Sequence, residues 1–529
     1  MALSREFLHR WTTRGAVLGA ALFLCAPLLM LALVPGDVVP GLWTHLREVM
    51  LPRAIGQTLV LLIGVGGLSL LLGIGAAWVV TRHEFPGRRA FEWLLALPMA
   101  FPAYVLAYAF VAGLSFDSPV ARAWRALGLP AEAFPEIRSL GGAILVLGLA
   151  LFPYIYLLLR ASLLRQGSAA FDAARLLGAS PLSAFIRVVL PATRPAWLGG
   201  LGLVLLETLA DFGAVKMLGR ETLTILIVQS WKGLQSLALA AQLSLAMLGV
   251  VLLALLLARL LRAGTTPPAA ELRPPRRTRL PTVAAFMVSG LCAAVVVIGL
   301  LFPLAQLLRW LPDDVFVALP LEAVRGTVVI AGLTAVFAVA IGLGLGAARR
   351  RFPQDRWIEI GAVGAGLGYA VPGLVMAVAV FWSLLALERA LGPAAAGLGI
   401  STGLLALVLA LLMRFQRVGL SGAEAALATL RPTLMHSAAL LGAGPWARAR
   451  RIALPVLRPG LLTAALLVFV ETMKELPATL MLRPFGWDTL AVQVYMATSE
   501  GLWSQAALPA LLLVAVGVVP VVALMRQRT

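Results

Sequence analysis

Long apolar runs separated by short polar breaks make up most of this chain. One crossing of a bilayer takes about 20 residues of α-helix, and each run reaches or approaches that length with little charge inside it. The runs lie near residues 15–35, 54–81, 91–114, 140–162, 195–218, 236–262, 282–308, 323–348, 357–386, 399–418, 459–482 and 505–525. The pattern predicts an all-α polytopic membrane protein with about twelve transmembrane helices.

Composition and charge support this interpretation. Hydrophobic residues make up 61% of the chain, charged residues 13%, and the mean hydropathy is +0.95. An ordinary soluble domain has about 25% charged residues, so a soluble enzyme is excluded. The net charge of +19 would suit nucleic acid, but the arginines fall in short clusters between apolar runs. We therefore expect contact with the lipid bilayer and no nucleic-acid partner.

The basic clusters occupy alternate loops, which predicts the orientation of the chain. They all lie on the side of the N-terminus if every run crosses once, and basic loops face the cytoplasm. Both termini should therefore be cytoplasmic. These clusters span residues 82–89, 160–194, 259–279, 349–356, 414–458 and 526–528.

A repeat along the chain predicts its architecture. Residues Ala174–Pro181 recur as Ala438–Pro445, and Glu207-Thr208 returns as Glu471-Thr472 at the same offset. The chain is thus a tandem duplication. Because six crossings are an even number, we expect two six-helix halves of the same orientation, related by a pseudo-twofold axis along the membrane normal. The predicted parts are residues 1–262, a Pro- and Arg-rich cytoplasmic linker at 263–281, and residues 282–529.

Each half carries a loop of fixed spacing before its fifth crossing. The first reads Asp172-Ala173-Ala174-x3-Gly178-x9-Val188-x-Leu190-Pro191. The second reads His436-Ser437-Ala438-x3-Gly442-x9-Ile452-x-Leu454-Pro455. We expect a short helix, a glycine turn and a second helix stopped by Leu-Pro, which together form a knob that docks into a partner's groove.

This spacing resembles the EAA loop of ABC-transporter permeases, Glu-Ala-Ala-x3-Gly-x9-Ile-x-Leu-Pro. The likeness extends over most of both halves and is greatest to fused type I importer permeases of the ferric-iron uptake type. It implies a bacterial inner-membrane location, two copies of a cytoplasmic ABC ATPase and a periplasmic substrate-binding protein. It assigns ATPase coupling to Asp172, Ala173, Ala174, Gly178, Leu190, Pro191, His436, Ala438, Gly442, Leu454 and Pro455.

The second loop departs from that pattern, and the chain lacks a nucleotide motif. His436 and Ser437 replace the acidic residue and the first alanine, so we expect the two knobs to grip their ATPases unequally. No lysine follows a glycine, whereas a P-loop needs Gly-Lys-Ser/Thr. We expect no catalytic residue and no cofactor in this chain, with ATP and Mg²⁺ bound by the partner subunits.

Carboxylates inside two apolar runs are the candidate substrate path. Glu207 lies about twelve residues into its crossing, Asp211 follows at i+4, and Glu471 and Glu475 repeat the spacing. A carboxylate at bilayer depth costs a few kcal/mol and usually faces a bundle interior or a water-filled path. The spacing predicts an acidic throat. In the alternative, Lys474 pairs with Glu471 or Glu475 and the carboxylates are structural ion pairs or helix caps.

The chemistry of these carboxylates suggests the cargo. Hard oxygen ligands suit hard cations such as Fe(III), so we predict a ferric-iron importer with transient metal contact at Glu207 and Glu471. A permease for another small cation, such as thiamine or a polyamine, is the alternative within the class. A proton-coupled secondary transporter with Glu207 and Glu471 as proton carriers is the alternative from another class.

Overall fold

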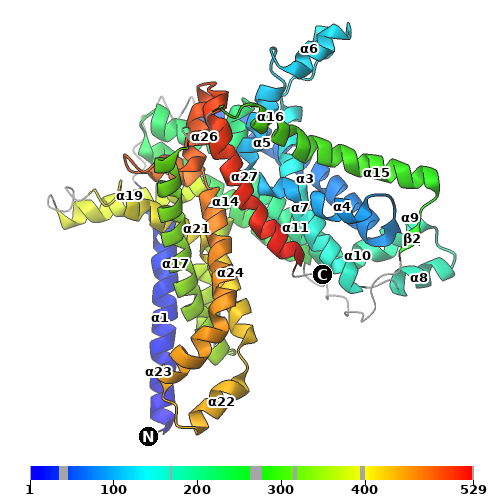
Figure 1. Cartoon of the computed structure of the whole chain (residues 1–529). Helices are drawn as coiled ribbons and strands as arrows, with labels where there is room; N and C mark the ends of the chain where they lie inside the picture. The colour runs from blue at the N-terminus through cyan, green and yellow to red at the C-terminus, as the bar shows by residue number, and fades with distance from the viewer. Residues whose placement is uncertain are drawn as a thin grey trace. The chain divides into compact units, whose positions relative to one another are not determined.

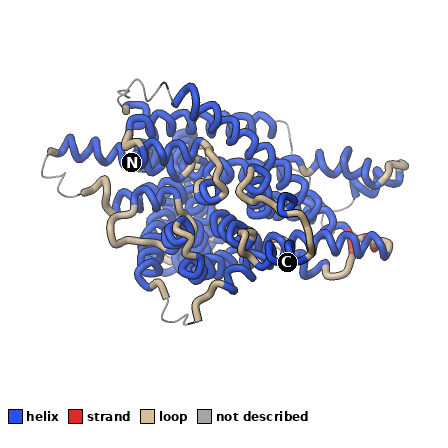
Figure 2. The backbone as a smooth tube through the Cα atoms, turned by 90° about the horizontal axis from the view of Figure 1, so that it is seen from above, coloured by secondary structure: helices blue, strands red, loops and turns tan. Residues whose placement is uncertain are grey.

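The computed structural model describes residues 2–34, 44, 46–166, 169–262, 277–313, 319–392 and 399–526. Helices make up most of the described chain (Figure 2). Inside a bilayer the backbone N–H and C=O groups must bond to one another, and a helix pairs them within one segment. One small parallel ladder joins β1 (His83–Glu84) to β2 (Thr278–Arg279). Residues 263–276 of the predicted linker lie outside the described residues. Asp314, an acidic residue of a predicted loop, lies outside them as well.

The predicted fold class is confirmed by the helices themselves. Among the described residues, ten helices are long and apolar enough to cross a membrane, and two bent pairs raise the number to twelve. One pair, Arg88–Ala100 with Ala103–Gly113, bends by 95°. The other, Pro181–Ala192 with Arg194–Ala210, bends by 73°. The crossing expected at 91–114 is therefore broken, and Pro102, which has no N–H to continue the helix, stands at the break.

The helices group into two compact units. The first comprises Met1–Val38, Ser230–Ala246 and Pro320–Gln493. Four of its helices run roughly side by side along the same direction, namely α1, α17, α21 and α24 (Figure 1). Helix α17 contacts both α21 and α24. Its elements are α1 (Ala2–Met30), η1 (Leu31–Leu33), α17 (Leu321–Arg351), α18 (Arg356–Ala365), η8 (Leu367–Ala370), α19 (Gly373–Leu391), α21 (Leu404–Thr429), α22 (Pro432–Leu440), α23 (Pro445–Arg448), η9 (Ala449–Ala453), α24 (Leu454–Met473) and α25 (Pro477–Leu482).

The second unit comprises Val39–Gln229, Met247–Leu319 and Val494–Thr529. Its elements are η2 (Leu46–Met50), α3 (Leu51–Arg82), β1, α4 (Arg88–Leu94), η3 (Leu97–Ala100), α5 (Ala103–Gly113), α6 (Pro119–Ala126), η4 (Ala131–Ala133), α7 (Leu140–Gln166), α8 (Ala169–Leu176), α9 (Pro181–Ala184), η5 (Phe185–Val189), α10 (Leu190–Ala192), α11 (Arg194–Ala210), α12 (Gly213–Met217), α13 (Leu223–Val228), β2, α15 (Thr282–Val296), η7 (Val297–Leu301), α16 (Phe302–Arg309) and α27 (Trp503–Arg526). The boundary between the units runs through η6 (Gln229–Gly233), α14 (Leu237–Arg262) and α26 (Leu490–Ser499).

Glycines allow the central helices of each unit to approach closely. A Cβ atom at Gly342 of α17 would lie 2.7 Å from the backbone of Gly419 on α21. In the second unit, a Cβ at Gly73 or at Gly200 would lie 2.7 Å from Ile155 of α7. Small residues at such crossings are typical of helix packing in membranes, where van der Waals contact drives association.

The first helix of each sequence half packs with helices of the other half. Helix α1 contacts α18 and α19 in the first unit, and α15 contacts α4 in the second. Arg10 and Arg14 donate to one carboxylate oxygen of Asp355, at 2.6 and 2.8 Å. The Ser289 hydroxyl of α15 donates to the Pro86 carbonyl at 2.9 Å. The predicted boundaries at 262 and 282 follow the duplication. The packing units do not, because α1 of the first sequence half packs with the second half and α15 of the second packs with the first.

Candidate transport site

The first candidate coupling loop, the first knob (residues 169–192), consists of short helices joined at a left-handed glycine. Asp172, Ala173 and Ala174 lie on α8, and Gly178 follows the helix with φ of +88°. The N–H of Gly178 donates to the Arg175 carbonyl and that of Ala179 to the Ala174 carbonyl, both at 3.1 Å. These two bonds satisfy the last carbonyls of the helix, and glycine meets the required φ without strain.

The second knob (residues 432–455) repeats this geometry. His436 and Ala438 lie on α22, and Gly442 has φ of +81°. The N–H of Gly442 donates to Ala439 and that of Ala443 to Ala438, both at 3.0 Å. The side chains before each glycine are strongly exposed, so they are accessible to another protein. They are Leu176 and Leu177, each 89% exposed, and Leu440 and Leu441, 89% and 88% exposed.

The Leu-Pro pair stops a helix in the first knob only. There the helix Pro181–Ala192 ends directly after Pro191, whereas the helix Pro445–Met473 runs through Leu454-Pro455, so the expectation is wrong for the second knob. Leu190-Pro191 opens α10 after the π-helical turn η5, and Leu454-Pro455 opens α24 after the equivalent turn η9. Proline has no N–H to donate, and a local π-helical turn shifts the backbone hydrogen bonds so that the helix can continue past it. The π-helical turns place one extra residue before each proline.

The two knobs are attached differently to their own units. Arg82, at the end of α3, pairs with Asp172 at 2.5 Å and lies 4.4 Å above the ring of Phe171. The Arg82 side chain is 7% exposed, so the pair fixes α8 to a largely buried charge. In the second knob His436 is exposed. There Arg350 donates to the carbonyls of Leu427 and Leu430 at the end of α21.

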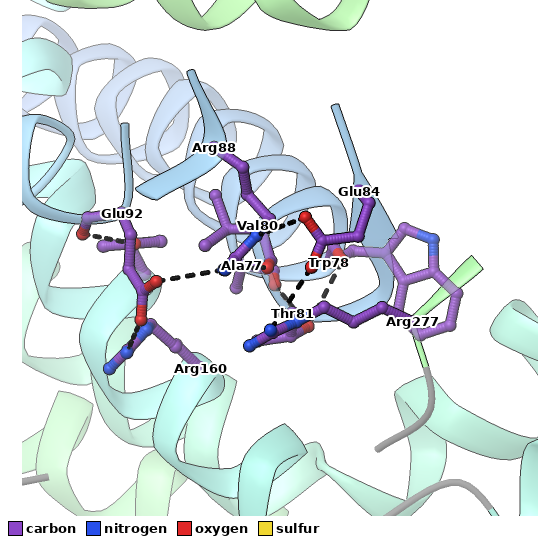
Figure 3. Close-up of polar contacts among 10 residues, drawn as sticks. Ala77, Trp78, Val80, Thr81, Glu84, Arg88, Glu92, Arg160 and Arg277 are labelled. Carbon is purple, nitrogen blue, oxygen red and sulfur yellow. Dashed lines mark hydrogen bonds and ion pairs between the residues drawn. The ribbon is translucent and has the colours of Figure 1, made fainter. Parts of the chain in front are cut away.

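A network of charges fixes the base of α4 in the second unit (Figure 3). Arg88 donates to Glu84 and to Glu92, both at 3.1 Å. Arg160 of α7 pairs with the other oxygen of Glu92, and Arg277 donates to Glu84 at 3.3 Å. The network therefore joins α4 to α7 and to the segment that leads into β2, next to the first knob. The two pairs of Arg88 are i,i+4 neighbours, whereas the pairs of Arg160 and Arg277 join residues far apart in sequence, for which hydropathy patterns carry no signal.

A related network in the first unit uses different charges. Arg349 pairs with Glu359 at 2.8 Å and with Glu424, beside a cavity of about 490 Å³. Asp355, which accepts from Arg10 and Arg14, also caps α18 through the N–H of Trp357. Burial alone would raise the pKa of Asp355, but the hydrogen bonds from Arg10 and Arg14 outweigh it and lower this pKa to about 2.

The carboxylates of the candidate path do not share one helix face as expected. Glu207 is half-buried on α11, which ends at Ala210. Asp211 has an extended backbone, with φ of −69° and ψ of 128°, and its Oδ1 accepts from the N–H of Val215 at 3.0 Å. Asp211 lies beyond the helix and caps the short helix α12. The prediction that Glu207 and Asp211 project from one helix face is therefore wrong.

The second pair follows the same rule. Glu471 is half-buried near the end of α24, whereas Glu475 lies beyond that helix. The carboxylate of Glu475 accepts from the N–H groups of Ala478 and Thr479 at 2.9 and 3.1 Å, and so caps α25. Arg414 of α21 lies 4.0 Å from it. Glu475 therefore has the contacts of a helix cap and of an ion pair, which was the alternative to a role in the path. Its neighbour is Arg414, whereas the alternative named Lys474.

Each unit thus contributes its own pair of carboxylates, with one member on a helix and one at a helix cap. Within the described ranges, no group of three or more His, Cys, Asp or Glu residues is arranged to hold a metal ion. The two cysteines, Cys25 and Cys292, are not in a disulfide. The acidic residues of each unit can attract a cation, and the leucine-tipped knobs can dock against another protein.

Comparison with known families gives a match in both halves. The family model described as the inner membrane component of binding-protein-dependent transport systems matches residues 69–266 and again residues 338–527. Each match includes one knob and one path carboxylate pair. The repeated match agrees with the duplication deduced from the sequence.

Individual relatives differ in the cargo that their names state. The Fe(3+)-transport system permease protein FbpB 2 of Haemophilus influenzae is 27% identical over 525 residues, which cover 97% of both chains. The sulfate transport system permease protein CysW of Escherichia coli is 32% identical over 202 residues, 36% of this chain and 68% of that protein. A putative 2-aminoethylphosphonate permease, PhnV of Salmonella typhimurium, is 36% identical over 96 residues, 18% of this chain and 36% of its own length.

Proposed function

Because the chain belongs to the family of inner membrane components of binding-protein-dependent transport systems, we propose that it is the fused permease of a ferric-iron importer. Its membership makes it a transport permease and not an enzyme. In the proposal, a periplasmic binding protein delivers the cargo and two copies of a cytoplasmic ABC ATPase supply the energy. ATP and Mg²⁺ are bound by those ATPases, and both termini of the permease face the cytoplasm.

The observation that carries the proposal is the full-length likeness to FbpB 2, a permease whose name states Fe(3+) transport. CysW and PhnV match 36% and 18% of this chain, although at higher identity. Carboxylates at bilayer depth support the same cargo, because hard oxygen ligands suit Fe(III). The cation is cargo and would touch Glu207 and Glu471 only in passing.

The two knobs support coupling to a pair of ATPases. Each presents an exposed leucine pair directly before a left-handed glycine, at equivalent positions of the two halves. In the proposed mechanism, ATP-driven closure of the ATPases pulls the knobs together, the halves rock, and the path opens alternately to the two sides. The residues assigned to coupling are those of the EAA-like loops, from Asp172 to Pro191 and from His436 to Pro455.

Uptake of labelled ferric iron tests the function directly. The permease is expressed with its cognate ATPase and binding protein, in cells that lack their own ferric uptake. We expect iron uptake that requires all three components and is lost when the ATPase cannot hydrolyse ATP. Uptake of sulfate, thiamine or a polyamine in place of iron would contradict the proposed cargo, and uptake that persists without the ATPase would contradict the class.

A further inference from the structure

Two arginines that the charge pattern assigned to the cytoplasmic cluster at 414–458 instead lie near the middle of a helix long enough to cross a membrane, and they have no counterpart in the other half. Helix α21 has 26 residues and includes Arg414 and Arg417. At 1.5 Å per residue it is about 39 Å long, and both arginines lie within about 4 Å of its midpoint. The equivalent helix of the first half, α7, has no charged residue from Leu140 to Leu159. The pair is therefore not a consequence of the duplication.

Arg417 lies on the exposed face of α21 in the first unit. The helix packs on α17, α24, α19 and η8, and its exposed positions recur at helical spacing as Arg417, Ser421, Ala425 and Ala428. Within the described part of the chain, no residue forms a hydrogen bond or ion pair with Arg417. A guanidinium within a membrane helix is costly against lipid and usually faces a bundle interior or a water-filled path.

Arg414 lies one turn away with unused hydrogen-bonding capacity. Its side chain is 11% exposed, and its Nη1 has no hydrogen-bond partner among the residues that the structure describes. Glu475 lies 4.0 Å away, but its oxygens already accept from the backbone of α25. Arg414 is thus close enough to Glu475 for charge compensation, while its donors remain available.

Two glycines make room for these arginines. A Cβ atom at Gly373 would lie 2.7 Å from Nη1 of Arg414. A Cβ atom at Gly366 would lie 2.9 Å from Cδ of Arg417. Any side chain at either position would displace the arginine beside it, so the glycines help to place both guanidinium groups.

From these contacts we infer that Arg414 and Arg417 bind a small oxyanion, such as phosphate, carbonate or a carboxylate. The inference rests on the proposed function, in which a ferric ion passes the same helices. Two guanidinium groups would repel a bare trivalent cation, whereas an oxyanion that coordinates the ion offsets its charge and accepts paired N–H donors. The iron would then cross as a complex, with Glu471 attracting the cation and α21 holding its anionic ligand.

Binding of inorganic phosphate to the purified full-length chain in nanodiscs, followed by calorimetry, tests the site without iron. We expect the Arg417→Gln variant to bind phosphate about tenfold more weakly, as loss of a charged hydrogen bond predicts. Arg417→Lys keeps the charge and should retain most of the affinity. Arg389→Gln removes an exposed arginine at the end of α19 and is the matched control, with wild-type affinity expected. Unchanged phosphate affinity in a folded Arg417→Gln protein would overturn the inference.

Transport by the complete system separates this inference from the proposed function. We expect Arg417→Gln to lower uptake of labelled iron, and labelled phosphate to enter together with iron. Iron uptake at the wild-type level by Arg417→Gln would refute the oxyanion site and leave the ferric proposal standing. Phosphate uptake that needs no iron would confirm the oxyanion site and refute ferric iron as the cargo. Arg414 is not the primary variant because its removal also leaves Glu475 without its cation.

Discussion

Arg82 and Asp172 form an ion pair of 2.5 Å that connects the end of α3 to the first knob. Among the residues that the structure describes, the second knob forms no such ion pair: His436 is exposed, and Arg350 binds backbone carbonyls of α21. The two knobs share a backbone shape but not an anchor. A force applied to the first knob therefore reaches α3 through an ion pair. In the second knob, Met435 and Ala453 instead pack on a buried apolar cluster that includes Leu427 and Leu430.

This difference predicts unequal effects of matched substitutions. We expect Asp172→Ala to reduce iron uptake and ATPase copurification more than His436→Ala, because it leaves the largely buried Arg82 without its partner. The free-energy cost should be about 1 to 2 kcal/mol, since Asp172 is itself 44% exposed and screened by solvent. Arg82→Gln also breaks the pair but removes the buried charge, so it should weaken the attachment at a smaller cost in stability. Equal losses from Asp172→Ala and His436→Ala would rule out an anchoring role for the pair.

The left-handed glycines of the knobs predict a loss of coupling. Replacing Gly178 and Gly442 by Arg forces a side chain into φ near +80°, at a cost of about 1 kcal/mol or more at each site, and places charge beside the exposed leucines. We expect the variant to lose its ATPase subunits during purification.

Gly128 offers a matched control for this experiment. It also has positive φ, +71°, and open space around its Cα, but it lies in the loop after α6. Gly128→Arg should keep both ATPases and transport normally. A double Gly178→Arg, Gly442→Arg protein that still copurifies with two ATPases would show that the knobs are not the docking sites.

The carboxylates on the helices and those at the caps should behave differently. Changing Glu207 and Glu471 together to Gln removes two charges, each worth about 4 kcal/mol to a unit charge at 4 Å and an effective dielectric of 20. We expect iron uptake to fall strongly while the yield of extracted protein is kept. Glu475→Gln should instead lower the yield, because Glu475 caps α25 and lies beside Arg414. Normal uptake by the well-expressed double variant would remove the electrostatic argument for a cationic cargo.

The contact of α1 with Asp355 predicts a specific pH dependence of stability. The pKa of Asp355 falls from an ordinary 3.8 to about 2 in the folded protein. Its stabilising contribution is therefore complete above pH 3.8 and disappears as the pH falls through about 2. We expect Asp355→Asn to unfold at lower temperature at neutral pH and to show a weaker loss of stability below pH 3.8.

Thermal unfolding in detergent across this pH range measures the effect. Asp117→Asn, at an exposed aspartate outside any ion pair in the described structure, is the control and should follow the wild type. If Asp355→Asn and wild type lose stability in parallel below pH 3.8, the contact with Arg10 and Arg14 does not stabilise the fold.

Hydropathy and repeated spacing were enough to predict the membrane helices and the duplication, because both leave a periodic record in the sequence. They did not predict the breaks at Asp211 and Glu475, since a carboxylate in an apolar run looks the same on a helix as at a cap. The signal was present in Gly213 and Pro477, which follow each carboxylate at the start of a new helix. Nor did they reveal Arg82 as the partner of Asp172, which depends on tertiary packing.

The exchange of first helices between the sequence halves has a consequence for biosynthesis. Arg14 and Asp355 are separated by 341 residues. At about 5 to 20 residues per second, α1 leaves the ribosome roughly 20 to 70 s before the carboxylate that binds it has been made. During that interval α1 must stay in the membrane with lipid or an insertion factor in place of α18 and α19. Membrane insertion and final docking of this helix are therefore separate events, and one of the earliest segments to be synthesised is among the last to be fixed.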